Sequence, residues 1–312
     1  MFNGVSLSSI ILLTSLGLAI TFGLMRVINM AHGEFVMIGA YTTYVVQQIF
    51  VKYCPESIRD VYYFVAIPAA FGVTFILGSL LEKFIISRLY GREIDSLLAT
   101  WGISLILQQA ARSIFGTQGV NVTAPSFLNG GIKIGGCTFS YNRLFIILLV
   151  ALCLLLVWFI MYKSNFGKQM RAVMQNRTMA KCMGINSRKV DNITFAIGSG
   201  LAGIAGCSVA LLGSIDSTVG QSYIVNSFMA VVLGGVGKLL GTAIGSVIIG
   251  SASIFTENYT SSTIAKAIVL LIVIIFLQKR DRPADIEPAW VQLGKTEDGF
   301  AICLLYTSDA AD

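Results

Sequence analysis

One short segment brings ionisable and polar side chains into otherwise apolar sequence. It comprises Asn29, His32, Gly33 and Glu34, separated by Met30 and Ala31. His32 is the single histidine of the chain, so a metal site built from several histidines is excluded. Asn29 or Glu34 could cap the first backbone donors of a helix, or the segment could line a path for a polar solute. The first interpretation is a helix break, the second a translocation path, and the sequence leaves both open.

A second interruption lies late in the chain, where Gly234, Gly235 and Gly237 divide a long apolar stretch. Paired breaks early and late in a chain are typical of transporters built from inverted repeats, with a solute site between the breaks. Glycines also permit close helix packing, so this alternative stays open. Further side chains that could line a polar path are Thr100, Gln108, Gln109, Ser199, Asn226 and Ser227.

Catalytic chemistry is not expected. The pair Gly237-Lys238 lacks the other residues of a phosphate-binding loop, so the sequence offers no ATP-binding motif of this kind and no cofactor is expected in this chain. No set of residues suited to nucleophilic or metal-assisted catalysis is evident in the apolar segments. The sequence therefore predicts a protein that is not an enzyme.

A third segment, residues 163–190, is strongly basic and holds no acidic residue. Its pattern predicts a helix that ends at a glycine cap, Gly184. Methionines recur along it at helical spacing, which favours docking into a groove of a partner protein. They are Met170, Met174, Met179 and Met183. The alternative is a solvated loop that merely follows the charge rule for membrane proteins.

Composition identifies the elements that must hold these segments. Of the 312 residues, 55% are hydrophobic and 12% are charged, and the charged share is about half that of a soluble domain. Apolar runs of roughly 20 residues each predict an all-α bundle of transmembrane helices, some of them broken, with eight or nine crossings. Residues 1–278 would form one membrane domain and residues 279–312 a polar tail, whose last ten residues resemble translated sequencing-adapter sequence.

Loop charges predict the orientation, because cytoplasmic loops are enriched in lysine and arginine. Residues 163–190 are then cytoplasmic, the loop over residues 116–142 lies outside with a small β-hairpin, and the N-terminus is outside. Cys54 and Cys137 fall on the outer side, and whether they pair is left open. The net charge of +6 is spread between apolar runs, so a nucleic-acid partner is not expected.

Four segments resemble the permease subunits of branched-chain amino-acid type ABC importers, and most closely the urea permease branch. They are residues 23–34, 97–109, 171–185 and 227–237, within a resemblance that covers residues 5–277. The resemblance implies that a helix in residues 163–190 couples the permease to its ATPase. The implied coupling residues are Arg171, Gln175, Asn176, Arg177, Ala180 and Gly184.

The same resemblance implies the assembly and its mechanism. Two cytoplasmic ATP-binding subunits, a second permease chain and a periplasmic solute-binding protein would work with this chain in the lipid of the bacterial inner membrane. Alternating access would import a small polar solute, either urea or a short amide, with branched-chain amino acids as the alternative. A channel or facilitator that needs no ATP is the alternative class, and it would need no docking helix.

Overall fold

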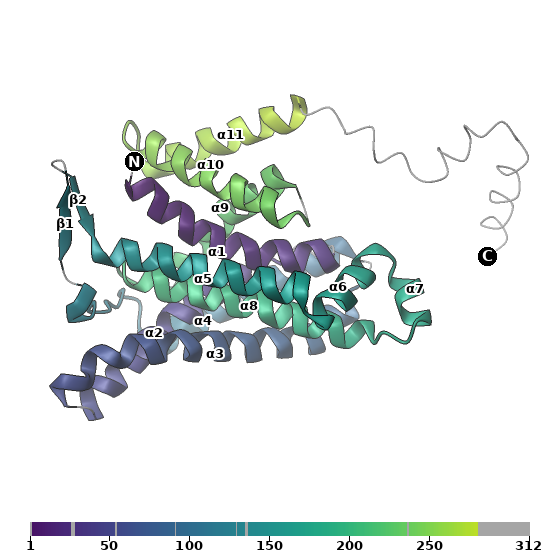
Figure 1. Ribbon diagram of the computed structural model, residues 1–312, viewed down its shortest axis with the longest axis horizontal. Coiled ribbons are helices and arrows are strands. Elements are labelled where there is room, and N and C mark those ends of the chain that lie inside the picture. The colour runs from purple at the N-terminus through teal and green to yellow at the C-terminus, as the bar shows by residue number, and fades with distance from the viewer. Residues whose placement is uncertain are drawn as a thin grey trace, which may run out of the picture. The chain divides into compact units, whose positions relative to one another are not determined.

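The computed structural model describes residues 2–25, 29–53, 55–90, 92–128, 130–134, 137–235 and 237–279 (Figure 1). The longer helices are α1 (Phe2–Met25), α2 (His32–Tyr53), α3 (Tyr62–Phe84), α4 (Glu93–Phe115), α5 (Tyr141–Lys163), α8 (Ser187–Ala210), α9 (Val219–Gly234), α10 (Leu239–Glu257) and α11 (Ser262–Lys279). Between them lie α6 (Asn165–Gln175), α7 (Arg177–Cys182), three short turns η1 (Glu56–Val61), η2 (Ile86–Arg88) and η3 (Ser126–Leu128), and two strands. Cys54 and almost all of the predicted tail lie outside the described residues.

The predicted helical architecture is confirmed. Within the described residues, five helices are long and apolar enough to cross a membrane, namely α1, α3 with its flanking turns, α5, α8 and α10. The apolar parts of α9 and α11 are shorter. α2 and α4 have similar lengths to the five, but polar side chains such as Glu34, Gln47 and Gln108 interrupt their apolar sequence. The number of crossings, eight or nine, stays a prediction.

The chain divides into two compact units, residues 1–269 and 270–312, and the boundary falls inside α11. In the second unit the described residues are 270–279, the apolar C-terminal part of α11. All contacts described below belong to the first unit.

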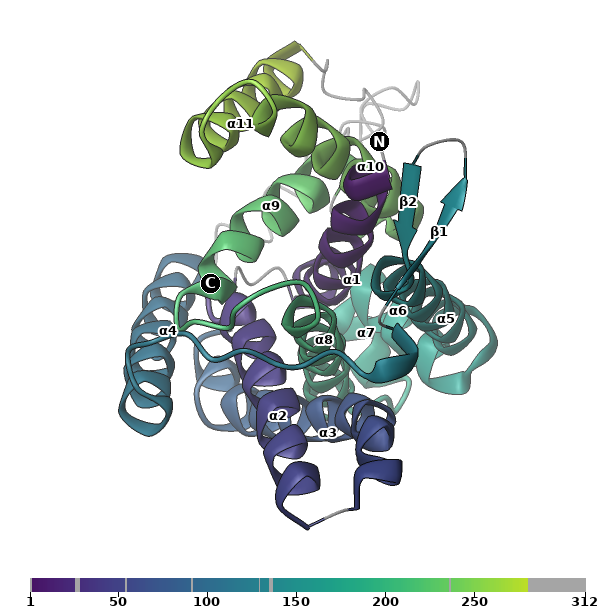
Figure 2. The same cartoon turned by 90° about the vertical axis from the view of Figure 1, so that its left-hand side faces the viewer.

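α8 is the central helix of the first unit, and α1, α2 and α3 pack around it (Figure 2). Small residues on α8 allow this close approach. In a lipid bilayer the hydrophobic effect does not drive helices together, so close packing at small residues stabilises their association. Gly203 stands directly against Gly39 of α2, and a Cβ added at Gly203 would also lie 2.8 Å from the carbonyl oxygen of Ala70 in α3. The sequence of α8 thus fixes the positions of two neighbouring helices.

Two helices begin in the interior of this bundle rather than at its ends. The His32 ring at the start of α2 lies beside the middle of α1, with Nε2 3.1 Å from the carbonyl oxygen of Thr14. Gly33 in turn stands against Gly220, the second residue of α9. α2 and α9 therefore meet at their N-terminal ends, at the depth of the centre of α1.

α9 and α10 form a helical hairpin, so the predicted division of the long apolar stretch into two helices is confirmed. Gly234 stands against Gly241, and Gly245 stands against the carbonyl of Ala230. α10 then runs antiparallel along α1, where the hydroxyl oxygens of Ser15 and Ser246 lie 2.7 Å apart.

The β-hairpin and the short helices α6 and α7 mark opposite ends of the unit (Figure 1). Strands β1 (Gly131–Ile134) and β2 (Cys137–Ser140) pair antiparallel, with Gly131 opposite Ser140. A hairpin was predicted between residues 116 and 142, and it is present there. Its side of the membrane stays a prediction.

Candidate functional site

Residues 29–31, just before α2, are held by the side chain of Asn29 and by a contact with α4. Asn29 Oδ1 accepts a hydrogen bond from the backbone N–H of Ala31 at 3.0 Å, which closes a turn immediately before α2. The backbone N–H of Met30 donates to Thr100 Oγ1 of α4 at 3.2 Å. The break thus has a defined conformation, with α4 as its partner.

Glu34 does not cap α2 with its side chain, because its carboxylate contacts α4 instead. Oε1 accepts hydrogen bonds from Ser104 Oγ and from Gln108 Nε2, both at 2.8 Å. The residue is only 1% exposed, and Oε2 has no hydrogen-bond partner within the described part of the chain. An ionisable group held in this way between two helices is costly in a membrane, which makes Glu34 a candidate for a functional site.

α4 presents a row of polar side chains at every fourth position, which places them on one face of the helix. The row runs Ser96, Thr100, Ser104, Gln108 and Arg112, and its first four members are buried. At its far end Arg112 Nε donates to Ser217 Oγ, just before α9, at 2.8 Å. Other faces of α4 expose large apolar side chains such as Ile94 and Ile106. The polar row of α4 therefore contacts the chain at the start of α2 and just before α9.

The sequence interpretation named Thr100 and Gln108 in this region but missed Ser96, Ser104 and Arg112. The missing signal was the four-residue spacing of polar side chains within an apolar helix. Two other candidates lie elsewhere. Gln109 is exposed, and Ser199 donates to the carbonyl oxygen of Phe195 in its own helix at 2.9 Å.

The late glycines break a helix, as predicted, but among the described residues they lie against the end of α1 rather than against the start of α2. Gly235 and Gly237 have φ values of 90° and 80°, which turn the chain between α9 and α10. Gly237 lies against Gly23 at the end of α1, whereas the His32 ring lies against Gly17. Gly17 and Gly23 are six residues apart, so the two contacts are separated by about 9 Å along α1. The start of α2 therefore contacts the start of α9 at Gly220. The break at Gly234, Gly235 and Gly237 forms a separate turn near α6.

The predicted coupling helix is two helices. α6 ends at Gln175, and Asn176, with φ −153°, caps α7 by accepting from the backbone N–H of Met179 at 3.0 Å. Gly184, with φ 80°, ends α7 as expected, since the backbone N–H of Ile185 reaches the carbonyl oxygen of Ala180 at 3.0 Å. The helical pattern continued through Asn176, which hid the break.

The row of methionines is divided between core and surface. Met170 is buried in the core, and Met174 is half-buried beside the turn at Gly237. Met179 and Met183 are 62% and 80% exposed. The apolar surface available to a partner is therefore formed by two methionines of α7 and its end rather than by four.

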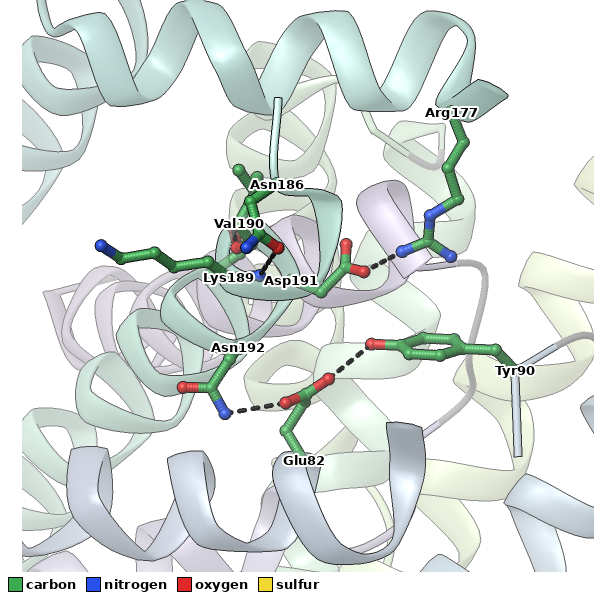
Figure 3. A network of polar contacts seen from close by, with 9 residues as sticks. Glu82, Tyr90, Arg177, Asn186, Lys189, Val190, Asp191 and Asn192 are labelled. Atoms are coloured by element: carbon green, nitrogen blue, oxygen red, sulfur yellow. Dashed lines mark hydrogen bonds and ion pairs between the residues drawn. The ribbon is translucent and has the colours of Figure 1, made fainter. Parts of the chain in front are cut away.

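Arg177 joins α7 to the bundle through a polar network (Figure 3). Its guanidinium pairs with the carboxylate of Asp191 in α8 and lies 4.8 Å from the ring centroid of Tyr90. Tyr90 Oη donates to Glu82 Oε1 at 2.8 Å, and Asn192 Nδ2 donates to Glu82 Oε2 at 2.7 Å. The network connects α7 with α3, α8 and the turn before α4.

Tyr90 stays protonated in this network. Burial, followed by the charge of Glu82, raises the pKa of the Tyr90 hydroxyl above its ordinary value. The hydroxyl therefore remains a hydrogen-bond donor to the carboxylate at neutral pH.

The six predicted coupling residues occupy different environments. The Arg171 guanidinium contacts the carbonyl oxygen of Met161 and lies 5.5 Å from the ring centroid of Tyr162, so it is engaged within the chain. Ala180 is buried, Arg177 is paired as described, and Gln175, Asn176 and Gly184 are exposed. Across the described residues, no group of three or more histidine, cysteine or acidic side chains is placed to hold a metal ion.

Comparison with known families assigns the chain to a family of transport proteins. The family described as branched-chain amino acid transport system / permease component matches residues 1–278. The chain belongs to this family. It is a multi-pass permease of the bacterial inner membrane and a component of an ABC transporter, not an enzyme. No solved structure matches the chain.

The LivH relatives match most of this permease, whereas a ribose permease matches less than half of it. The high-affinity branched-chain amino acid permease LivH of Escherichia coli K12 is 27% identical over 299 residues, which covers 89% of this chain and 91% of the relative. LivH of Salmonella typhimurium LT2 is 30% identical over 290 residues, with the same coverage. The ribose import permease RbsC of Escherichia coli K12 is 28% identical over 143 residues, which covers 42% of this chain and 44% of the relative.

Proposed function

We propose that this chain is the permease subunit of an ATP-driven importer of branched-chain amino acids. The family match over residues 1–278 carries the proposal. The LivH relatives are branched-chain amino acid permeases by name, and they support the amino-acid alternative rather than urea, the first expectation from the sequence. Urea remains a competitor that the transport experiment below addresses.

The partners follow from this class of transporter. We propose two cytoplasmic ATP-binding subunits, a second permease chain and a periplasmic solute-binding protein, with ATP bound by the partners. The exposed Met179 and Met183, with the exposed Lys181 between them, support α7 as a docking surface for the ATPase. The network around Arg177 would then pass a movement of α7 to α8 and to the start of α4.

Nine crossings agree with the contacts and with the charge rule. α6 and α7 are basic and are placed on the cytoplasmic side, so α1 runs inward from an outer N-terminus and ends near the turn at Gly237. α10 runs antiparallel to α1 and therefore outward. α2 and α9 would each complete a crossing from a start in the interior of the bundle, and the β-hairpin would lie outside.

Uptake by right-side-out vesicles, loaded with ATP and supplied with the solute-binding protein outside, tests the proposal. Vesicles that carry the permease with its genomic partners should accumulate labelled leucine only with ATP, and should accumulate labelled urea much less. Met183→Glu places a charge on the exposed docking surface and should reduce ATP-dependent uptake severalfold. Gln118→Glu, an exposed position at the opposite end of the unit, is the matched control.

Two results would contradict the proposal. Leucine uptake that ignores ATP would leave a facilitator, and ATP-dependent uptake of urea without leucine would reinstate the urea permease.

A further inference from the structure

Three side-chain atoms at the start of α2 are buried without a hydrogen-bond partner in the described part of the chain. They are Asn29 Nδ2, His32 Nδ1 and Glu34 Oε2, on residues that are 1%, 0% and 1% exposed. Nearly all buried polar groups in native proteins are hydrogen-bonded, so each exception requires an explanation such as a bound molecule. Three exceptions within six residues indicate a common cause.

Two further atoms of this kind lie on α9, at Asn226 Oδ1 and Ser227 Oγ. Ser227 follows Gly220 by seven residues, which places both on one face of the helix together with Ile224. A Cβ added at Gly33 would meet Gly220 and would lie 3.0 Å from Ile224 Cβ. The face of α9 that carries Ser227 is thus the face that meets the start of α2.

The donor and acceptor roles of the three atoms on α2 follow from the contacts of their neighbours. Asn29 Oδ1 accepts from the backbone of Ala31, so Nδ2 is left as a donor. His32 Nε2 lies 3.1 Å from a carbonyl oxygen, which can only accept, so Nδ1 of the neutral ring is an acceptor. Glu34 Oε1 is occupied by Ser104 and Gln108, and Oε2 is a free acceptor.

We propose that this junction of α2 and α9 binds the charged head of an α-amino acid in transit, with Glu34 Oε2 contacting the ammonium group. This inference rests on the proposed function. Glu34 and His32 supply acceptors for the ammonium protons, and Asn29 Nδ2 donates to the carboxylate at the positive N-terminal end of α2. A zwitterion therefore completes the unsatisfied groups, and its ammonium compensates the buried carboxylate of Glu34.

The test uses the purified complex of the permease with its ATP-binding partners, without the solute-binding protein, so that the binding protein contributes no affinity. Binding of labelled leucine is measured directly, and two analogues compete for the site. Isopentylamine lacks the carboxylate, and 4-methylpentanoate lacks the ammonium. The wild-type complex should bind leucine and be competed more strongly by the amine than by the acid.

Glu34→Gln keeps the size of the side chain and removes its charge, so it should weaken leucine binding about tenfold or more, through loss of a charge-assisted hydrogen bond. Glu34→Asp retains the charge and should bind better than Glu34→Gln. Thr43→Val is the matched control, because it removes another buried polar group from α2 that already bonds within the protein. It should leave leucine binding unchanged.

The inference is overturned if the wild-type complex binds no leucine, if Glu34→Gln binds leucine as well as the wild type, or if 4-methylpentanoate competes as well as isopentylamine. Better binding by Glu34→Gln than by Glu34→Asp would also overturn it. Failure of leucine uptake in vesicles would instead reject the proposed function. Normal leucine uptake with no effect of Glu34→Gln on uptake or binding would reject this inference alone.

Discussion

Arg177 is fastened to the permease's own Asp191 rather than left for a partner. Resemblance to a family selected Arg177 as a coupling residue, but its contact with Asp191, fourteen residues later, arises only when α7 folds against α8. Glu34 is similar, since Ser104 and Gln108 come some seventy positions later. At the residue scale, sequence identifies which side chains are unusual, whereas their partners depend on tertiary packing.

Charge reversal tests the role of Arg177. Arg177→Asp should lower the thermal stability of the purified complex, since removing one partner of a mostly buried ion pair costs about 3 kcal/mol. It should also reduce leucine uptake per ATP hydrolysed. Adding Asp191→Arg should restore both quantities, because the pair is re-formed with its charges exchanged.

Arg188→Asp, an exposed reversal at the start of α8, is the control and should change stability little. A double variant with restored stability but unrestored coupling would show that Arg177 acts on the ATPase directly. An Arg177→Asp variant with the stability of the wild type would show that the pair with Asp191 is unimportant.

At the scale of helices, apolar runs predicted the long helices, because spanning the bilayer requires about 20 such residues whatever the tertiary structure. The sequence did not show which helix starts and breaks contact one another. Gly33 faces Gly220 through packing between distant helices, whereas Gly234, Gly235 and Gly237 form a local turn. The sequence shows where a helix stops and gives no measure of the depth at which it does so.

The contact of α2 with α8 gives a prediction at this scale. Gly39→Ala would place a Cβ 2.6 Å from Gly203 Cα, and backbone on a neighbouring helix moves only with the whole helix. We expect a loss of about 1–3 kcal/mol, measured as thermal unfolding of the purified complex.

Gly102→Ala in α4 is the matched control, since a Cβ there meets nothing within 4 Å. It should be neutral or stabilise by about 0.5–1 kcal/mol, because alanine favours helix over glycine. Equal behaviour of the two variants would show that the α2 and α8 contact is looser than described.

At the scale of the molecule, the basic segment and the hairpin lie at opposite ends of the first unit (Figure 1). The charge rule assigns these ends to opposite sides of the membrane. In a background without native cysteines, Gln118→Cys should react with a membrane-impermeant maleimide in intact spheroplasts. Met183→Cys should react only after the membrane is permeabilised.

Both positions are exposed, so neither result depends on burial. Labelling of Met183→Cys in intact spheroplasts would show that the orientation is the opposite one and that the docking surface lies outside.

The interior start of α2 also has a consequence for synthesis on the ribosome. α8, which covers α2, begins roughly 150 residues later, so about 8–30 s of translation separate the two helices at 5–20 residues per second. α4 emerges first and offers Ser104 and Gln108 to Glu34, and α9 arrives last. A nascent chain that stops before α9 therefore holds a buried polar segment that lacks the contact between Gly33 and Gly220.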